Sequence, residues 1–72
     1  MKNLLKRYGF NSDMQYYEMI AESFLNGQRT QALAQFKALP KNNKKQLLIT
    51  IFSENWNSGI SKRDTILLLE AL

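Results

Sequence analysis

The 72-residue chain contains neither cysteine nor histidine. Without cysteine, no disulfide framework can supplement the hydrophobic core, and nothing in the sequence indicates an oxidising compartment. Without either residue, the chain also lacks an imidazole base, a thiolate nucleophile and the usual nitrogen and sulfur ligands of zinc. Its three glycines stand apart at expected turns, so no glycine-rich phosphate cradle exists. These absences argue against an enzyme.

The remaining polar residues offer little for catalysis or metal binding. The carboxylates are scattered, and the closest helical pair, Glu18 and Glu22, falls on the polar side of an expected helix. Ser12 and Ser61 are better explained as helix caps than as nucleophiles. We therefore expect a non-enzymatic protein with no cofactor, no metal and no catalytic residue.

Long hydrophobic runs are also missing. The longest uninterrupted run, residues 66–69, is far shorter than the roughly 20 apolar residues that span a bilayer. Residues 1–10 lack the continuous apolar stretch of a signal peptide. The sequence therefore predicts a cytoplasmic protein that makes no membrane contact. Its length and its ordinary composition, 44% hydrophobic and 22% charged, predict a single domain over residues 1–72.

Apolar periodicity and capping signals predict an all-α fold, a compact bundle of four to five short helices. A capping box of Ser12 and Gln15 begins the second helix, and Ser61 with Asp64 offers a similar box before the last. Pro40 separates the third helix from the fourth. The expected helices span residues 2–8, 12–25, 29–39, 41–55 and 62–72.

The spacing of apolar residues also predicts which side of each helix faces the core. In the second helix the core face comprises Met14, Tyr17, Ile20, Ala21, Phe24 and Leu25. Tyr16 and Met19 point away from this face and lie three residues apart, so we expect them to meet on the outer surface. In the fourth helix, apolar residues occupy an arc of about 200°, which predicts that it is the central element of the bundle. These residues are Leu47, Leu48, Ile49, Ile51, Phe52 and Trp56.

The last helix presents apolar residues around almost its whole circumference. Together with the fourth helix it requires more burial than a bundle of this size provides, because only about one helix can be fully enclosed. We therefore predict an interaction module that acts by self-association, most simply as a homodimer, or by binding a protein partner. Alternatively, the first helix folds over the last and leaves a compact monomer. The predicted partner-binding residues are Tyr16, Met19, Leu67, Leu68 and Leu72.

A second hypothesis starts from the net charge of +4. Four lysines within nine residues span the expected junction between the third and fourth helices, and Arg29 is a further candidate. Clustered cations of this kind bind phosphates and release counterions. However, the helix that follows is dominated by core residues, whereas a DNA-reading helix exposes polar ones. Nucleic-acid binding through Arg29, Lys37, Lys41, Lys44 and Lys45 is therefore the alternative function.

One part of the chain resembles a known group of proteins. Residues 16–28 (YYEMIAESFLNGQ), followed by Gln31-Ala32 and residues 36–40 (FKALP), are similar to uncharacterised small helical proteins encoded by bacterial phages and other mobile elements. The resemblance covers about 25 residues. It implies a helical fold and a mobile-element origin, but no activity and no site.

Overall fold

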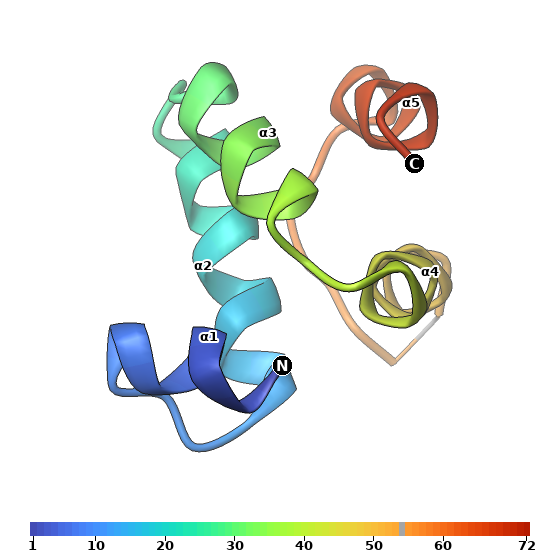
Figure 1. The fold of residues 1–72 in the computed structure, drawn as a ribbon. Helices are drawn as coiled ribbons and strands as arrows, with labels where there is room; N and C mark the ends of the chain where they lie inside the picture. The colour runs from blue at the N-terminus through green and yellow to red at the C-terminus, as the bar shows by residue number, and fades with distance from the viewer. Residues whose placement is uncertain (54) are drawn as a thin grey trace.

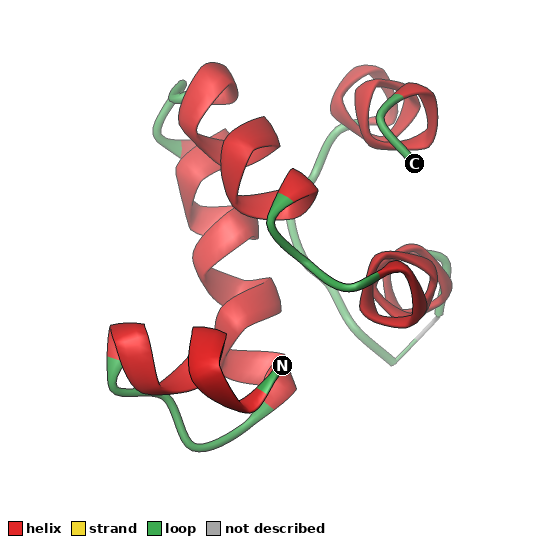
Figure 2. Ribbon diagram, in the orientation of Figure 1, coloured by secondary structure: helices red, strands yellow, loops and turns green. Residues whose placement is uncertain are grey.

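A computed structural model describes residues 1–53 and 55–72, which form helices joined by short connections (Figures 1 and 2). The helices are α1 (Lys2–Tyr8), α2 (Asp13–Leu25), α3 (Arg29–Lys37), α4 (Lys41–Ile51) and α5 (Lys62–Glu70). Among the described residues there is no strand. The prediction of an all-α bundle of four to five short helices is therefore confirmed.

Local side-chain chemistry explains where two of the helices begin. Ser12 Oγ accepts a hydrogen bond from the Gln15 amide at 3.3 Å, and Gln15 Oε1 accepts one from the Ser12 amide at 3.2 Å. The predicted capping box of α2 is therefore present. Ser61 Oγ likewise accepts a hydrogen bond from the Asp64 amide at 3.1 Å. The Asp64 carboxylate accepts a hydrogen bond from Arg29, so only the Ser61 half of the predicted capping box is present at α5.

Helix α2 contributes the largest number of buried residues, and α3 packs against both α2 and α5. Figure 1 shows α1 crossing the beginning of α2 and α3 lying along it, while α4 and α5 lie together on the far side of α3. In the same view α4 and α5 are both seen nearly end-on, and the chain runs through them in opposite directions. The core residues are Tyr16, Tyr17, Ile20, Phe24, Ala32, Phe36, Leu39, Leu47, Leu48 and Leu68.

The prediction that the fourth helix is the central element is wrong. Helix α4 ends at Ile51, and residue 54 of the predicted helix lies outside the described residues. Leu47 and Leu48 are buried, but Ile49 and Phe52 are 63% and 67% exposed. A helix at the edge of a bundle has neighbours on one side only, so a wide apolar arc cannot all be covered.

Leu25 also lies outside the core, although its position in α2 predicts a core residue. It occupies the last turn of α2 and is largely exposed. Its side chain lies against Gly59, in the connection between α4 and α5, where an added β-carbon would come within 3.0 Å of Leu25 Cδ2. Gly59 has a φ of +77°, a left-handed backbone conformation that favours glycine at this turn.

The described helices are all too short or too polar to cross a membrane.

Candidate functional site

Tyr16 belongs to the core and not to a partner-binding surface. Its side chain is 0% exposed, and its hydroxyl donates a hydrogen bond to the Gln35 carbonyl at 2.7 Å. Tyr8 and Phe10 pack edge-on against its ring, with centroids 5.6 and 6.4 Å away. The prediction of an exposed Tyr16 is wrong because α1 and the segment after it cover this side of α2. Met19 is half-buried and packs against the same core.

The burial of Tyr16 has a consequence for stability at high pH. Burial removes water from the Tyr16 hydroxyl and raises its pKa from 10.0 to about 12, and electrostatic repulsion from Tyr8 acts in the same direction. Because the folded pKa lies above the unfolded one, its stabilising contribution is complete below pH 10 and disappears as the pH rises through 12. We expect this group alone to lower the free energy of unfolding by about 2 kcal/mol between pH 10 and pH 12.

The variant Tyr16→Phe isolates this effect, because burial also raises the pKa of Tyr17 and both proteins share that contribution. Urea denaturation at several pH values should show the wild type more stable by about 1 kcal/mol near neutral pH, the contribution of one buried hydrogen bond. This advantage should vanish above pH 11. Stability profiles that stay parallel through pH 12 would contradict the assignment.

Helix α5 presents a different set of leucines to solvent from the predicted one. Leu68 is completely buried and Leu67 is half-buried, whereas Leu72 is exposed as predicted. Leu68 is therefore corrected from a partner-binding residue to a core residue. Ile66 and Leu69 are exposed in its place. Apolar residues at nearly every angle of a helix leave its rotation undetermined, so the sequence could not indicate which of them face the core.

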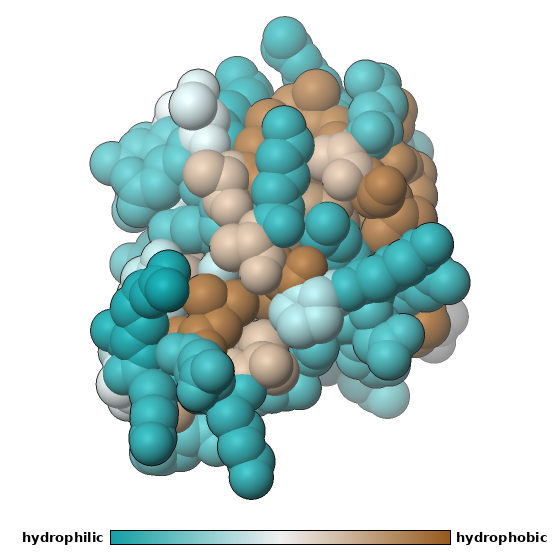
Figure 3. Space-filling model, in the orientation of Figure 1, coloured by the Kyte–Doolittle hydropathy of each residue, from teal (hydrophilic) through white to brown (hydrophobic). Residues whose placement is uncertain are grey.

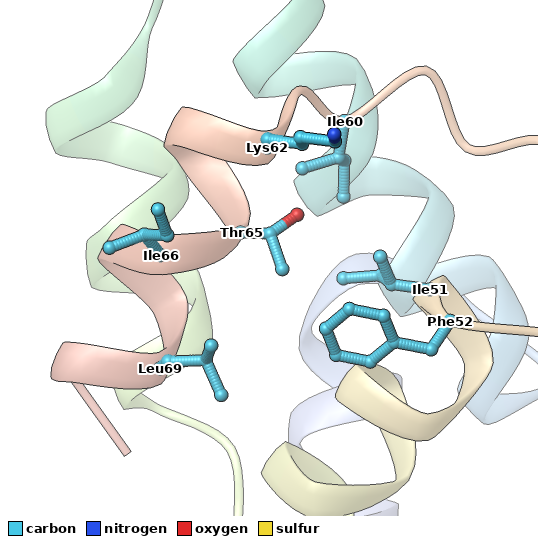
Figure 4. A pocket seen from close by; sticks show the side chains of 7 residues that line it. All are labelled: Ile51, Phe52, Ile60, Lys62, Thr65, Ile66 and Leu69. Carbon is cyan, nitrogen blue, oxygen red and sulfur yellow. The ribbon is translucent and has the colours of Figure 1, made fainter.

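A groove of about 460 Å³ lies between α4 and α5. Figure 4 shows Phe52 and Leu69 pointing toward one another from the two helices, with Thr65 directed into the space between them. Ile49, three residues before Phe52, and Leu72, three residues after Leu69, are exposed as well. The lining residues are Ile51, Phe52, Ile60, Lys62, Thr65, Ile66 and Leu69. Among them Lys62 supplies the charged group.

The basic residues of the alternative hypothesis do not form one group. Arg29 Nε donates to Asp64 Oδ1 at 2.8 Å, which links the beginning of α3 to the beginning of α5. Arg29 is therefore a structural residue, a contact between positions 35 residues apart that the sequence pattern could not indicate. The other four (Lys37, Lys41, Lys44 and Lys45, here called the lysine cluster) lie at the end of α3 and in the first turns of α4. In the described part of the chain they form no salt bridge.

Whether the described carboxylates gather at one place decides whether they could hold a metal ion. Over residues 1–53 and 55–72, the structure brings together no group of three or more carboxylates that could hold a metal ion. The structural features that remain as candidates are the α4–α5 groove and the lysine cluster. No protein-family model, curated protein or solved structure matches the chain.

Proposed function

We propose that the protein is a non-enzymatic interaction module that binds an amphipathic helix of a partner protein in the groove between α4 and α5. One observation carries the proposal: five large apolar side chains on or next to these two helices are 46% to 67% exposed. They are Ile49, Phe52, Ile66, Leu69 and Leu72. Contiguous apolar surface on a small soluble domain is typical of an association site.

The shape of the groove favours a helix as the occupant. Two antiparallel helices form its walls, and side chains from both walls point into it (Figures 1 and 4). A third helix fits such a groove by placing its own ridge of side chains between those of the walls. Its anchors would be apolar residues at positions i, i+3, i+4 and i+7, the pattern by which amphipathic helices dock into grooves.

The charge around the groove favours a partner with acidic residues over a second copy of this chain. The net charge is +4, and Lys62 lies in the groove itself. On α4, Lys45 lies one turn before the exposed Ile49. A symmetric dimer through this face would bring like charges together, which disfavours association. A helix with Glu or Asp beside its apolar stripe would instead neutralise these lysines.

A selection experiment tests the proposal. A displayed library of helical peptides would keep the apolar positions fixed and vary the flanking positions among Glu, Gln and Lys. We expect the wild-type protein to enrich peptides with Glu at the flanks. The variant Leu69→Glu should bind the selected peptides at least about tenfold more weakly, because it places a charge in the apolar contact. Leu25→Glu, at another exposed leucine (64% against 46% for Leu69) that lies outside the groove, is the control and should retain binding.

Sedimentation equilibrium of the unliganded protein tests whether a second copy of the chain, and not a partner helix, occupies the groove. A dimer that Leu69→Glu dissociates and Leu25→Glu leaves intact would overturn the partner helix in favour of a second copy. If the library yields no peptide that distinguishes these two variants, the groove is not a docking site and the proposal fails.

A further inference from the structure

Positive charge is concentrated on one part of the molecule. Of the ten basic residues, seven belong either to α1, as Lys2, Lys6 and Arg7, or to the lysine cluster. The salt bridge found among the described residues engages Arg29, which lies outside this set. In Figure 1, α1, the end of α3 and the beginning of α4 all face the viewer. Figure 3 shows the same face, where hydrophilic side chains surround a strip of apolar surface.

A second groove, of about 440 Å³, joins α1 to α3 on this face. Arg7 and Tyr8 line it from α1, and Gln31, Gln35 and two alanines line it from α3. One of these alanines, Ala38, lies at the end of α3 and directly follows Lys37, the first residue of the lysine cluster.

Tyr8 provides a fixed aromatic surface beside these cations. Its ring stacks on Phe10 at a centroid distance of 5.7 Å and contacts Tyr16 edge-on at 5.6 Å. Nevertheless the residue is 42% exposed. The ring therefore packs against the aromatic core while the residue stays partly exposed, and Tyr8 lines the groove together with Arg7.

The carboxylates of the described residues are spread over different parts of the molecule. Glu18 and Glu22 line a different hollow together with Met19, and Asp64 is paired with Arg29. Asp13 lies beside the lysine cluster, where its carboxylate accepts a hydrogen bond from Asn43 Nδ2 at 3.0 Å. Within residues 1–53 and 55–72, the face therefore combines cations that form no salt bridge, the partly exposed Tyr8 and the hydrogen-bonded Asp13 carboxylate.

We infer that this face binds single-stranded nucleic acid, independently of the α4–α5 groove. Clustered lysine and arginine side chains engage backbone phosphates and release counterions. A cationic groove with an exposed aromatic ring is the arrangement by which proteins hold single strands, since any base can stack on the ring. A duplex is less suited to the face, because its bases are already paired and stacked on one another, so none is free to stack on the Tyr8 ring.

Fluorescence anisotropy with a labelled oligothymidine of about 16 nucleotides tests this inference. We expect binding at about 50 mM salt, and a dissociation constant roughly 50-fold higher at about 200 mM salt if about four phosphates are engaged. A mixed-sequence duplex of the same length should bind more weakly. Tyr8→Leu, which keeps an apolar contact with Tyr16 but removes the stacking surface, should weaken binding by about fivefold or more.

Two double variants with the same change in net charge provide the matched control. Lys37→Gln with Lys41→Gln should weaken binding at least about tenfold, because two phosphate contacts are lost. Lys62→Gln with Arg63→Gln, at the beginning of α5, should change binding by less than about twofold. Leu69→Glu should also leave it unchanged, which separates this inference from the docking proposal.

Several results would overturn the inference. Absence of binding at the lower salt concentration would do so, because electrostatic binding is strongest there. Equal losses in the two double variants would show that only net charge matters. Unchanged affinity in Tyr8→Leu, or equal affinity for the duplex, would exclude the single-strand arrangement. Competition by polyglutamate as effective as by oligothymidine would indicate a general affinity for polyanions.

Discussion

Replacing Phe36 by alanine is expected to lower the free energy of unfolding by about 3–5 kcal/mol. Phe36 is completely buried on α3, among the core residues of α2, α4 and α5. The loss combines the transfer of a large apolar side chain to water with the cavity left behind. Because a single core in a domain of this size rarely supplies more than about 3–5 kcal/mol, the variant should be largely unfolded. Urea denaturation followed by far-UV circular dichroism measures the effect.

Phe52→Ala makes the same chemical change at the edge of the α4–α5 groove and is the matched control. This side chain is already 67% exposed, so the loss should stay below about 1 kcal/mol. Similar losses in the two variants would contradict the structure, because they would mean that Phe52 is covered in solution or that Phe36 is not.

The variant Leu68→Glu is expected to unfold the protein, whereas Leu69→Glu should fold normally. Leu68 is completely buried on α5, and a carboxylate placed there would lack both water and a partner, which is among the most destabilising single changes, above about 4 kcal/mol. Leu69 is about half exposed, so glutamate at this position can remain solvated. Thermal unfolding of the two variants under identical conditions would separate them.

The reverse result, a folded Leu68→Glu and an unfolded Leu69→Glu, would mean that α5 is rotated by about 100° about its axis. In that case the apolar groove of α4 and α5 would not exist as described, and the proposed docking function would lose its basis. Equal stability of the two variants would indicate that α5 does not pack stably on α3.

The helices were predictable because their signals are local. Ser12 with Gln15, and Ser61 with Asp64, fix helix beginnings through hydrogen bonds that span three residues, and Pro40 separates two helices by its own backbone geometry. The spacing of Tyr17, Ile20, Ala21 and Phe24 likewise identifies the buried side of α2. These features do not depend on where the rest of the chain lies.

The position of each helix among its neighbours was not predictable in the same way. Tyr16 is buried because α1 returns over the beginning of α2, and Arg29 is engaged because α5 begins next to α3. Such contacts depend on the tertiary arrangement and leave no trace in the periodicity of one segment. The excess of apolar helix surface was apparent from the sequence, but its location at Phe52 and Leu69 required the structure.

The two proposed surfaces share helix α4, whose first turns carry lysines and whose last turn carries Ile49 and Phe52. They are nevertheless separable, since the charge variants at Lys37 and Lys41 and the apolar variant at Leu69 alter different ends of the bundle. A protein that retains one binding activity and loses the other would identify which surface is responsible.

Polar contacts hold the two helices that form the groove, α4 and α5, to different neighbouring helices. Asn43 Nδ2 donates to Tyr17 Oη and Asp13 Oδ2, both at 3.0 Å, and so ties α4 to α2. Arg29 and Asp64 tie α5 to α3. Because each wall is held to a different helix of the core, these contacts favour a groove that keeps its shape. An incoming helix would therefore meet a receptor already in its bound shape, with little conformational freedom left to lose.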